Sequence, residues 1–429
     1  MKFDILCKTL DGKPVQYVFD NMTNLIYDSN GERFDPRQHK NFEGIDEPYH
    51  TRRAFVFSPA NPSDKSTRIN VLKIQLGLNC NYHCKYCSQS TYRKNNHPVA
   101  SKEEIDHFFE MFDKADIKFI SEPKIELWGG EPLVYWKALK YLVPILHKRY
   151  PVADIAMITN GSLLSKEKVD FLYDNGVSIT ISHDAQGFSL RDDVNPMDDP
   201  KMKEVWLYAM NKAKEKNLRF GFNVVITPIN CNVFEVRDYF YKNFSPNVSF
   251  GFEGVVNYHS EDNKVYMFDA KKKEIFRQSI FQALTEEWEG DTWGSLKNRV
   301  IRMLEYLVHG VPAKYISARC SSPSPTNLVV DLKGDVVACQ NNNPEDFSIG
   351  HLEDYNNVKT DCMLHWSLRP NCPSCPFLVG CRGACPILNT KEYYKNCRNE
   401  ALINSVIFAV AWFHMTDSII QSIVPKKED

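Results

Sequence analysis

The first 66 residues show the alternation of apolar and polar side chains that predicts β-strands. Phe3-Asp4-Ile5-Leu6-Cys7 alternates, an Asp11-Gly12 turn signal follows, and Val15-Gln16-Tyr17-Val18-Phe19 returns in the same pattern. Asn24-Leu25-Ile26-Tyr27 predicts a third strand. We therefore expect a β-rich N-terminal segment over residues 1–66. Such a sheet either caps the next domain or offers an edge to an extended peptide, such as the leader of a substrate.

Between residues 67 and 312 the pattern alternates between strand-length apolar runs and helix-length amphipathic runs. The expected strands are 70–76, 124–128, 155–158, 177–181, 220–226 and 248–252. The expected helices are one opened by the capping box Ser101-x-x-Glu104, then 135–150, 165–173, 202–216 and 233–241, and finally 270–288 and 294–309. Six such repeats predict an α/β fold, a partial (β/α)6 TIM-like barrel, with any chemistry at the C-terminal ends of its strands.

The last quarter of the chain follows a different pattern. Residues 313–400 are rich in cysteine and show little regular periodicity, apart from a hairpin predicted by Leu328-Val329-Val330 and Val336-Val337-Ala338. The apolar stretch from Ala401 to Val424 is interrupted by polar residues. We interpret it as a packed helix in a C-terminal segment 401–429, and its polar interruptions argue against a membrane span.

Composition narrows the class of protein. The chain is 43% hydrophobic and 25% charged with a net charge of −2, which gives no sign of a nucleic-acid-binding surface. It opens with Met1-Lys2-Phe3-Asp4-Ile5, without the apolar core of a signal peptide. Thirteen cysteines, an odd number in 429 residues, do not suit a disulfide framework. We therefore expect a cytoplasmic protein whose cysteines bind metal.

Three cysteines fall within eight residues, Cys80, Cys84 and Cys87, in C-x3-C-x2-C spacing among polar neighbours. Three clustered thiolates predict an iron–sulfur site, with a zinc knuckle as the alternative. The spacing, with the aromatic Tyr86 before the last cysteine, resembles the loop of radical S-adenosylmethionine (SAM) enzymes. The resemblance implies that the three thiolates hold three irons of a [4Fe-4S] cluster, that the fourth iron binds SAM, and that Tyr86 lies near its adenine.

Polar motifs also follow the next three expected strands. Gly129-Gly130-Glu131 resembles the GGE motif of that family, whose backbone and glutamate bind the SAM ammonium group. Thr159 and Asn160 resemble the next motif, whose polar residue approaches the ribose or the carboxylate of SAM. Ser182 occupies the place of a family serine, and Arg191 that of a downstream arginine that pairs with the SAM carboxylate, although the residues between them depart from the usual pattern.

Seven further cysteines resemble the SPASM domain in their order and spacing: Cys320, Cys339, Cys372, Cys375, Cys381, Cys385 and Cys397. The resemblance implies two auxiliary clusters, and hence three [4Fe-4S] clusters in all. The implied ligands are Cys320, Cys339 and Cys385 for the nearer auxiliary cluster, and Cys372, Cys375, Cys381 and Cys397 for the farther one. The nearer cluster either keeps an open iron site or gains Cys362 as its fourth ligand. Zinc ribbons are the alternative for this region.

The resemblance implies reductive cleavage of SAM, with an electron from an external one-electron reductant such as flavodoxin or ferredoxin. The 5′-deoxyadenosyl radical then abstracts hydrogen from an unactivated C–H bond. SPASM relatives mostly act on peptides, so we expect a ribosomally made precursor peptide as the substrate. Sulfatase-maturing relatives usually carry an aspartate base after the second SPASM cysteine, where this chain has Gln340.

We therefore expect a maturase of ribosomally synthesised peptides that installs an intramolecular cross-link, with a carbon–carbon cyclophane favoured and a thioether next. Formylglycine formation of the sulfatase-maturing type is one alternative. A non-catalytic iron–sulfur protein for electron transfer or binding is another. Glu253, near a strand end, is a candidate base by position alone.

Overall fold

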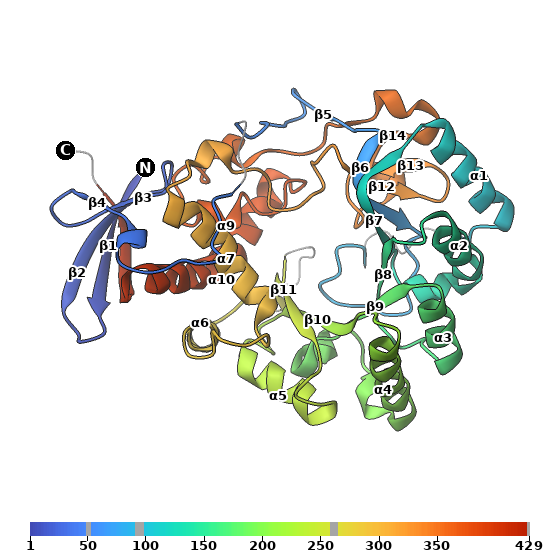
Figure 1. Ribbon diagram of the computed structural model, residues 1–429, viewed down its shortest axis with the longest axis horizontal. Coiled ribbons are helices and arrows are strands. Elements are labelled where there is room, and N and C mark those ends of the chain that lie inside the picture. The colour runs from blue at the N-terminus through green and yellow to red at the C-terminus, as the bar shows by residue number, and fades with distance from the viewer. Residues whose placement is uncertain (49–52, 91–97, 258–264, 427–429) are drawn as a thin grey trace.

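The structure is a computed structural model that describes residues 1–48, 53–90, 98–257 and 265–426. Its larger sheet has nine strands, in the order β11-β10-β9-β8-β7-β6-β12-β13-β14. The helices α1 to α5 lie outside the curve of this sheet, whose inner side faces the middle of the molecule (Figure 1). A smaller five-stranded sheet, in the order β16-β1-β2-β3-β4, lies at the far end of the molecule beside the long helix α10 (Figure 1).

Six neighbouring strands of the larger sheet run parallel and alternate with helices, which confirms the partial (β/α)6 barrel. The strands are β6 (Arg68–Gln75), β7 (Lys118–Trp128), β8 (Asp154–Thr159), β9 (Val177–Ser182), β10 (Phe220–Ile226) and β11 (Phe250–Val255). The helices are α1 (Lys102–Lys114), α2 (Trp136–Arg149), α3 (Lys166–Asp174), α4 (Pro200–Glu215), α5 (Val233–Asn243), α6 (Ala270–Thr285) and α7 (Gly294–His309). Strand β11 begins two residues later than expected, because Val248 closes a turn with Ser245.

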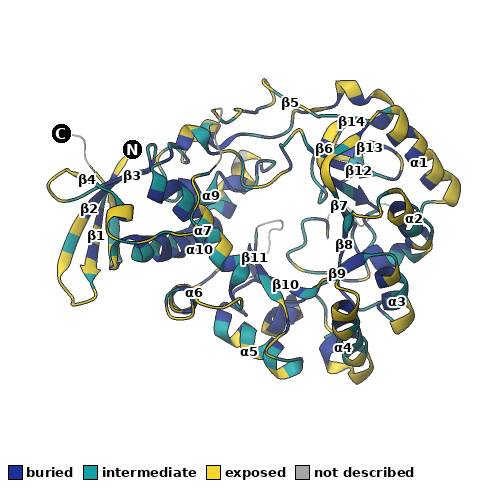
Figure 2. Cartoon of the chain, viewed as in Figure 1, coloured by how far each residue is buried: buried dark blue, intermediate teal, exposed yellow. Residues whose placement is uncertain are grey.

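Local sequence explains why these elements form where they do. Strand β8 alternates buried and partly buried residues along its length, as a strand with one face in the core requires. Helix α1 begins at the predicted capping box, in which Ser101 and Glu104 each accept a backbone N–H from the other. Figure 2 shows the exposed residues of the outer helices on the side away from the sheet and the buried ones toward it. The core therefore lies between the helices and the strands, and the strand ends remain available for a site.

The cysteine-rich region extends the barrel sheet. The expected hairpin is present as β12 (Asn327–Asp331) and β13 (Asp335–Val337), which pair antiparallel. In addition, β12 runs parallel to β6 and continues the sheet of the barrel, and β14 (Ser348–His351) pairs with β13. The shorter elements are β5 (Ser63–Asp64), β15 (Lys359–Thr360), α8 (Pro344–Phe347) and α9 (Leu378–Cys381). Cys339, which follows β13, is thus tied to the sheet of the barrel.

The expected helix from Ala401 to Val424 is wrong in both of its bounds. Helix α10 spans Thr390–Thr416, and Asp417 ends it in the left-handed conformation, with φ 51°. The following β16 (Ser418–Pro425) pairs antiparallel with β1 (Lys2–Thr9). Isoleucines and a valine at residues 419, 420, 423 and 424 suit either a helix or a strand, and pairing with the edge of β1 selects the strand.

The N-terminal segment forms its sheet together with this C-terminal strand. Its other strands are β2 (Pro14–Asp20), the expected third strand β3 (Leu25–Tyr27), and β4 (Arg33–Phe34). The sheet packs on α10 through aromatic contacts, in which the ring of Phe19 lies 5.3 Å from that of Phe408 and the ring of Tyr17 lies 5.5 Å from that of Trp412. No helix in the described part of the chain is long and apolar enough to cross a bilayer.

Candidate functional site

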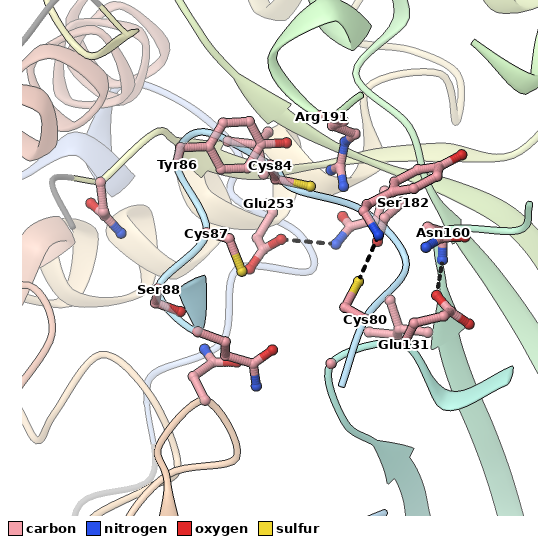
Figure 3. A pocket seen from close by; sticks show the side chains of 18 of the residues that line it. Cys80, Cys84, Tyr86, Cys87, Ser88, Glu131, Asn160, Ser182, Arg191 and Glu253 are labelled. Atoms are coloured by element: carbon pink, nitrogen blue, oxygen red, sulfur yellow. Dashed lines mark hydrogen bonds between the residues drawn. The ribbon is translucent and has the colours of Figure 1, made fainter. Parts of the chain in front are cut away.

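A pocket opens at the C-terminal ends of the barrel strands, where the fold predicts a site. It has a volume of about 1230 Å3 and is open to solvent on one side. Its lining includes Cys80, Cys84, Tyr86, Cys87, Gly129, Gly130, Glu131, Thr159, Asn160, Ser182, Arg191 and Glu253. In Figure 3 the three cysteines lie around this pocket, and Arg191 and Glu253 line it with them. The structure therefore brings the residues expected from the first three motifs and from the barrel strand ends into one place.

The two glycines hold the cysteine loop against the next strand. Gly130 donates its N–H to the carbonyl of Gly77 at 2.9 Å, and the N–H of Glu131 reaches the carbonyl of Asn79 at 2.9 Å. A Cβ atom on Gly130 would come under 3.0 Å from the backbone carbonyls of Leu78 and Asn79, a distance that real Cβ atoms do not show. The Gly-Gly pair is therefore required by this close backbone approach, whatever contact it also makes with a ligand.

Glu131 has a structural task that its motif does not reveal. Its carboxylate is buried, and it accepts hydrogen bonds from the Leu133 N–H at 2.9 Å, the Thr159 hydroxyl at 2.6 Å and the Asn160 N–H at 2.7 Å. Burial raises the pKa of Glu131, and the hydrogen bonds from Asn160 and Thr159 oppose that rise. The side chain thus fixes the loop after β8 against the loop after β7.

Asn160 connects that loop to the cysteine motif. Its side-chain amide donates to Asn81 Oδ1 at 2.9 Å, and Asn81 in turn donates to the Ser162 hydroxyl at 2.9 Å. Asn81 lies directly after Cys80 in the chain. The loops after β6, β7 and β8 therefore form one hydrogen-bonded unit around the pocket.

Arg191 lines the pocket and forms a buried ion pair within it. Its Nε and Nη2 atoms each lie 2.9 Å from a carboxylate oxygen of Asp184, which is fully buried. Asp184 also accepts a hydrogen bond from the Tyr86 hydroxyl and one from the Val225 N–H at 2.9 Å. Burial raises the pKa of Tyr86 well above its ordinary value, so the phenol is the donor. Asp184 therefore ties the cysteine loop to Arg191 and to β10.

His183, which departs from the family pattern, has a core role. Its ring is fully buried, stacks on Tyr239 with centroids 5.5 Å apart, and accepts the Ala185 N–H at Nδ1. Its Nε2 lies 3.0 Å from Asn195 Oδ1. Burial lowers the pKa of His183 to about 4, so the ring is neutral and is not a proton carrier at neutral pH.

The seven later cysteines fall into two groups when they are sorted by which thiols raise the pKa of one another. The pKa of Cys385 is raised to about 12, first by burial and then by the nearby Cys339 and Cys320. The pKa of Cys375 is raised to about 11, first by burial and then by Cys397 and Cys372. Cys381 likewise interacts with Cys375 and Cys372. These neighbours are the same as in the two ligand sets implied by the family resemblance, and the ligand sets themselves stay a prediction.

Comparison with known proteins identifies the barrel. The model of the radical SAM superfamily matches residues 74–232, which contain the three-cysteine loop and the strand ends described above. Residues 74–232 are a radical SAM domain. The serine-type anaerobic sulfatase-maturating enzyme of Bacteroides thetaiotaomicron is 24% identical over 355 residues, which are 72% of this chain and 81% of that protein.

Two further similarities differ in their extent. The radical SAM cyclopropyl synthase of Paramaledivibacter caminithermalis is 24% identical over 182 residues, which are 39% of this chain and 37% of that protein. The solved structure of anSMEcpe with bound AdoMet (SAM) and Cp18Cys peptide has a TM-score of 0.57 at 17% identity, and the match covers 81% of this chain and 99% of that one. At this identity the likeness concerns the fold.

A radical SAM domain implies a [4Fe-4S] cluster and SAM, and the residues present fit both. None of the thirteen cysteines, all of which lie in the described residues, forms a disulfide. Among the described residues no three His, Cys, Asp or Glu side chains converge as they would around a single ion. A four-iron cluster takes each thiolate on a different iron, so three separated thiols around one pocket suit it and leave one iron for SAM. Cys80, Cys84 and Cys87 would hold the cluster, and the polar strand ends would contact SAM.

Sequence reasoning missed two charged residues of this pocket. Asp184 is the shared partner of Tyr86 and Arg191, and its place two residues after Ser182 at a strand end was a usable signal. Arg319 lines the same pocket and pairs with the buried Glu400. Its position next to Cys320 gave no indication of this pairing, because the partner lies 81 residues away along the chain.

Proposed function

We propose that this radical SAM enzyme is a peptide maturase that installs an intramolecular cross-link in a ribosomally made precursor peptide, with a carbon–carbon cyclophane favoured over a thioether. The observation that carries the proposal is the junction between the pocket and the second cysteine group. Asn341 lines the pocket two residues after Cys339, and Arg319, which adjoins Cys320, lines it as well. A peptide in the pocket would therefore lie between SAM and the nearer auxiliary cluster.

When bound, the cysteine-loop cluster and SAM supply a 5′-deoxyadenosyl radical, which takes one hydrogen atom from the peptide and becomes 5′-deoxyadenosine. Closure onto a second side chain removes one more proton and one electron from the peptide, so the product has lost two hydrogens. An oxidised iron–sulfur cluster held by Cys320, Cys339 and Cys385 would be the acceptor for that electron. The protein's own task is to orient the two reacting side chains and exclude water.

The chain's carboxylates favour cross-linking over base-assisted aldehyde formation. The residue after Cys339 is Gln340, and amides continue to Asn343. Two glutamates line the pocket. The carboxylate of Glu131 already accepts three hydrogen bonds, so it is poorly placed to accept a proton from a substrate. Glu253 accepts a hydrogen bond from Asn223 at 3.0 Å. Glu253 remains the candidate base, because its side chain is exposed at the end of β11.

Formylglycine formation is the second candidate, and one observation favours it. The sulfatase-maturating relative aligns over 81% of its own length, which is more than the cyclopropyl synthase does. We rank it second because Gln340 lacks the charge of the aspartate expected there. We also propose that a flavodoxin or ferredoxin donates the electron and that the protein is cytoplasmic.

The test is mass spectrometry of a candidate precursor peptide after anaerobic incubation with the reconstituted enzyme, SAM and reductant. A cross-link predicts a loss of two hydrogens, no backbone fragments from inside a short ring, and no reaction with a hydrazide probe. Serine oxidation to formylglycine removes the same two hydrogens, but its aldehyde reacts with the probe. A hydrazide-reactive product would overturn the cross-link, and free-thiol labelling of an unreactive one separates cyclophane from thioether.

A further inference from the structure

We propose that a second pocket, beside the SAM pocket, binds a carboxylate group of the substrate peptide, a proposal that rests on the peptide maturase function. We call it the arginine pocket, because its lining includes Arg299, Arg302, Arg319 and Arg382. Its volume is about 750 Å3. Its four arginines come from three separate parts of the chain: α7, the segment before Cys320, and the residue that follows α9.

Separate elements of the fold bring these four guanidinium groups into one pocket. Arg299 and Arg302 are three residues apart on α7 and share one helix face. Arg382 ends α9 in the left-handed conformation, with φ 52°, and its guanidinium lies 5.1 Å from the centre of the Tyr306 ring. Like charges gathered in one pocket repel one another, so such a cluster is costly unless an anion binds there.

Three carboxylates, those of Glu253, Glu305 and Glu400, lie near the four arginines, so the cluster keeps an excess of positive charge. Within the described residues, Arg299 donates to the backbone carbonyl of Glu253, Arg302 to that of Asn298, and Arg382 to that of Val379. Arg319 alone is paired with a carboxylate, that of Glu400.

The lining of the arginine pocket and the pKa of Arg299 both indicate an excess of positive charge. Glu253 is the one carboxylate among the residues that line the arginine pocket. Burial, and after it the neighbouring Arg319, lower the pKa of Arg299 to about 10. An anion would relieve this repulsion, and a planar guanidinium matches a carboxylate with two parallel hydrogen bonds.

The arginine pocket adjoins the chemistry. Glu253 and Arg319 line both this pocket and the SAM pocket, and Cys320 lies in its wall. A peptide whose carboxylate is held there would place a neighbouring residue in the SAM pocket. The carboxylate is that of an aspartate or glutamate side chain, or the C-terminal carboxylate of the peptide. A second explanation is that the arginines only balance the negative charge of a cluster at Cys320.

The test uses the reconstituted full chain with SAM and two pools of random decapeptides, one with amidated C-termini and one with free C-termini. Bound peptides are sequenced, and the strongest binder is compared with its Asn or Gln counterpart. We expect enrichment of Asp or Glu in the amidated pool if the side chain binds, or of the free-acid pool if the C-terminus binds. Loss of the carboxylate should weaken binding at least tenfold.

Variants connect that preference to the pocket. Arg302→Gln and Arg382→Gln should each remove most of it, and Arg382→Lys should restore part of it because the charge remains. Arg277→Gln, an exposed arginine on α6, is the matched control and should bind like the unaltered protein. Iron content and the paramagnetic resonance signals of the reduced clusters should stay unchanged in all four.

Three results would overturn the carboxylate site: no acidic preference or no peptide binding at all, an unchanged preference in Arg302→Gln and Arg382→Gln, or a loss of cluster signal in those variants that assigns the arginines to cluster charge. The outcomes separate this inference from the maturase function. A peptide without any carboxylate that is modified at full rate sustains the function and overturns the site. Peptides that bind through their carboxylates but are never modified sustain the site and count against the function.

Discussion

The two cysteine regions of this protein are built in opposite ways. Cys80, Cys84 and Cys87 belong to one loop at the end of one strand, and backbone contacts with Gly130 hold that loop in place. The second region draws its cysteines from many elements. Cys339 follows the hairpin β12–β13, Cys381 ends α9, and Cys397 lies on α10.

The first cysteine region is therefore determined by local sequence, and the second by tertiary contacts. The first region needs a strand end and two glycines, which are properties of short stretches of chain. The second exists only when α10, the hairpin and the barrel sheet have assembled. A change in the first region should therefore remove SAM chemistry and leave the fold, whereas a change in the second should affect the fold as well.

The largest expected effect is on SAM cleavage. Cys84→Ala removes one of three proposed ligands, so formation of 5′-deoxyadenosine should fall at least about 100-fold and about four irons per chain should be lost. Cys381→Ala, its counterpart in the second region, should lose a similar amount of iron and still cleave SAM without peptide. Iron analysis and chromatography of the nucleoside measure both. Equal loss of cleavage in the two variants would erase the distinction between the regions.

The next effect concerns the charge beneath the first region. Asp184→Asn leaves the buried Arg191 guanidinium without its carboxylate, which should lower the free energy of unfolding by about 3–5 kcal/mol. It should also weaken SAM binding, because Tyr86 loses the acceptor of its hydroxyl. Denaturant unfolding and SAM titration measure these effects. Asp193→Asn, at an exposed position nearby, is the control, and a similar small change in both variants would contradict a buried pair.

A smaller effect tests the glycine contact itself. Gly130→Ala places a Cβ atom against two backbone carbonyls, and the forced displacement should cost about 1–3 kcal/mol. Gly294→Ala is matched to it, since nothing lies within 4 Å of the added atom and its backbone is not in the left-handed region. That change at the start of α7 should be neutral or slightly stabilising. Thermal unfolding of both proteins measures the difference in stability. Gly130→Ala should also lose more of the cluster than Gly294→Ala.

The same contrast explains what the sequence could predict. Helix α7 matches its expected bounds, strand β10 does too, and the capping box at Ser101 forms as written, because each depends on neighbouring residues. The three-cysteine loop was recognisable for the same reason. Contacts that decide β16 and the pairing of β12 with β6 join residues hundreds of positions apart, so periodicity alone could not reveal them.

The site divides in the same manner. The Gly-Gly pair and the polar strand ends could each be predicted as site residues from short stretches of sequence, and the structure places them around one pocket. The role of Glu131 as a hydrogen-bond acceptor for Thr159 and Asn160 could not be read, since it depends on how far β8 lies from β7. The arginine pocket was equally hidden, because α7, α9 and the segment before Cys320 meet only in the folded chain.

The smallest expected effect sharpens the boundary of the second region. Cys362 is the remaining candidate for a fourth ligand of the nearer auxiliary cluster. Its pKa is raised to about 11, first by burial and then by Asp361, while Cys339 contributes least among its neighbours. Its side chain also packs on the small apolar cluster of Phe57, Ala338 and Met363. We propose that Cys362 is a packed thiol and that the nearer cluster keeps an open iron site.

We therefore expect Cys362→Ser to leave the iron content and the spectra of the reduced clusters unchanged. The loss of packing should cost about 1 kcal/mol or less in the free energy of unfolding. Cys385→Ser, an implied ligand of the same cluster, is the comparison and should lose that cluster's signal. If Cys362→Ser loses the same signal, the nearer cluster has four cysteine ligands. In that case no iron there is free to bind a substrate atom, and the electron from the peptide must reach a fully coordinated cluster.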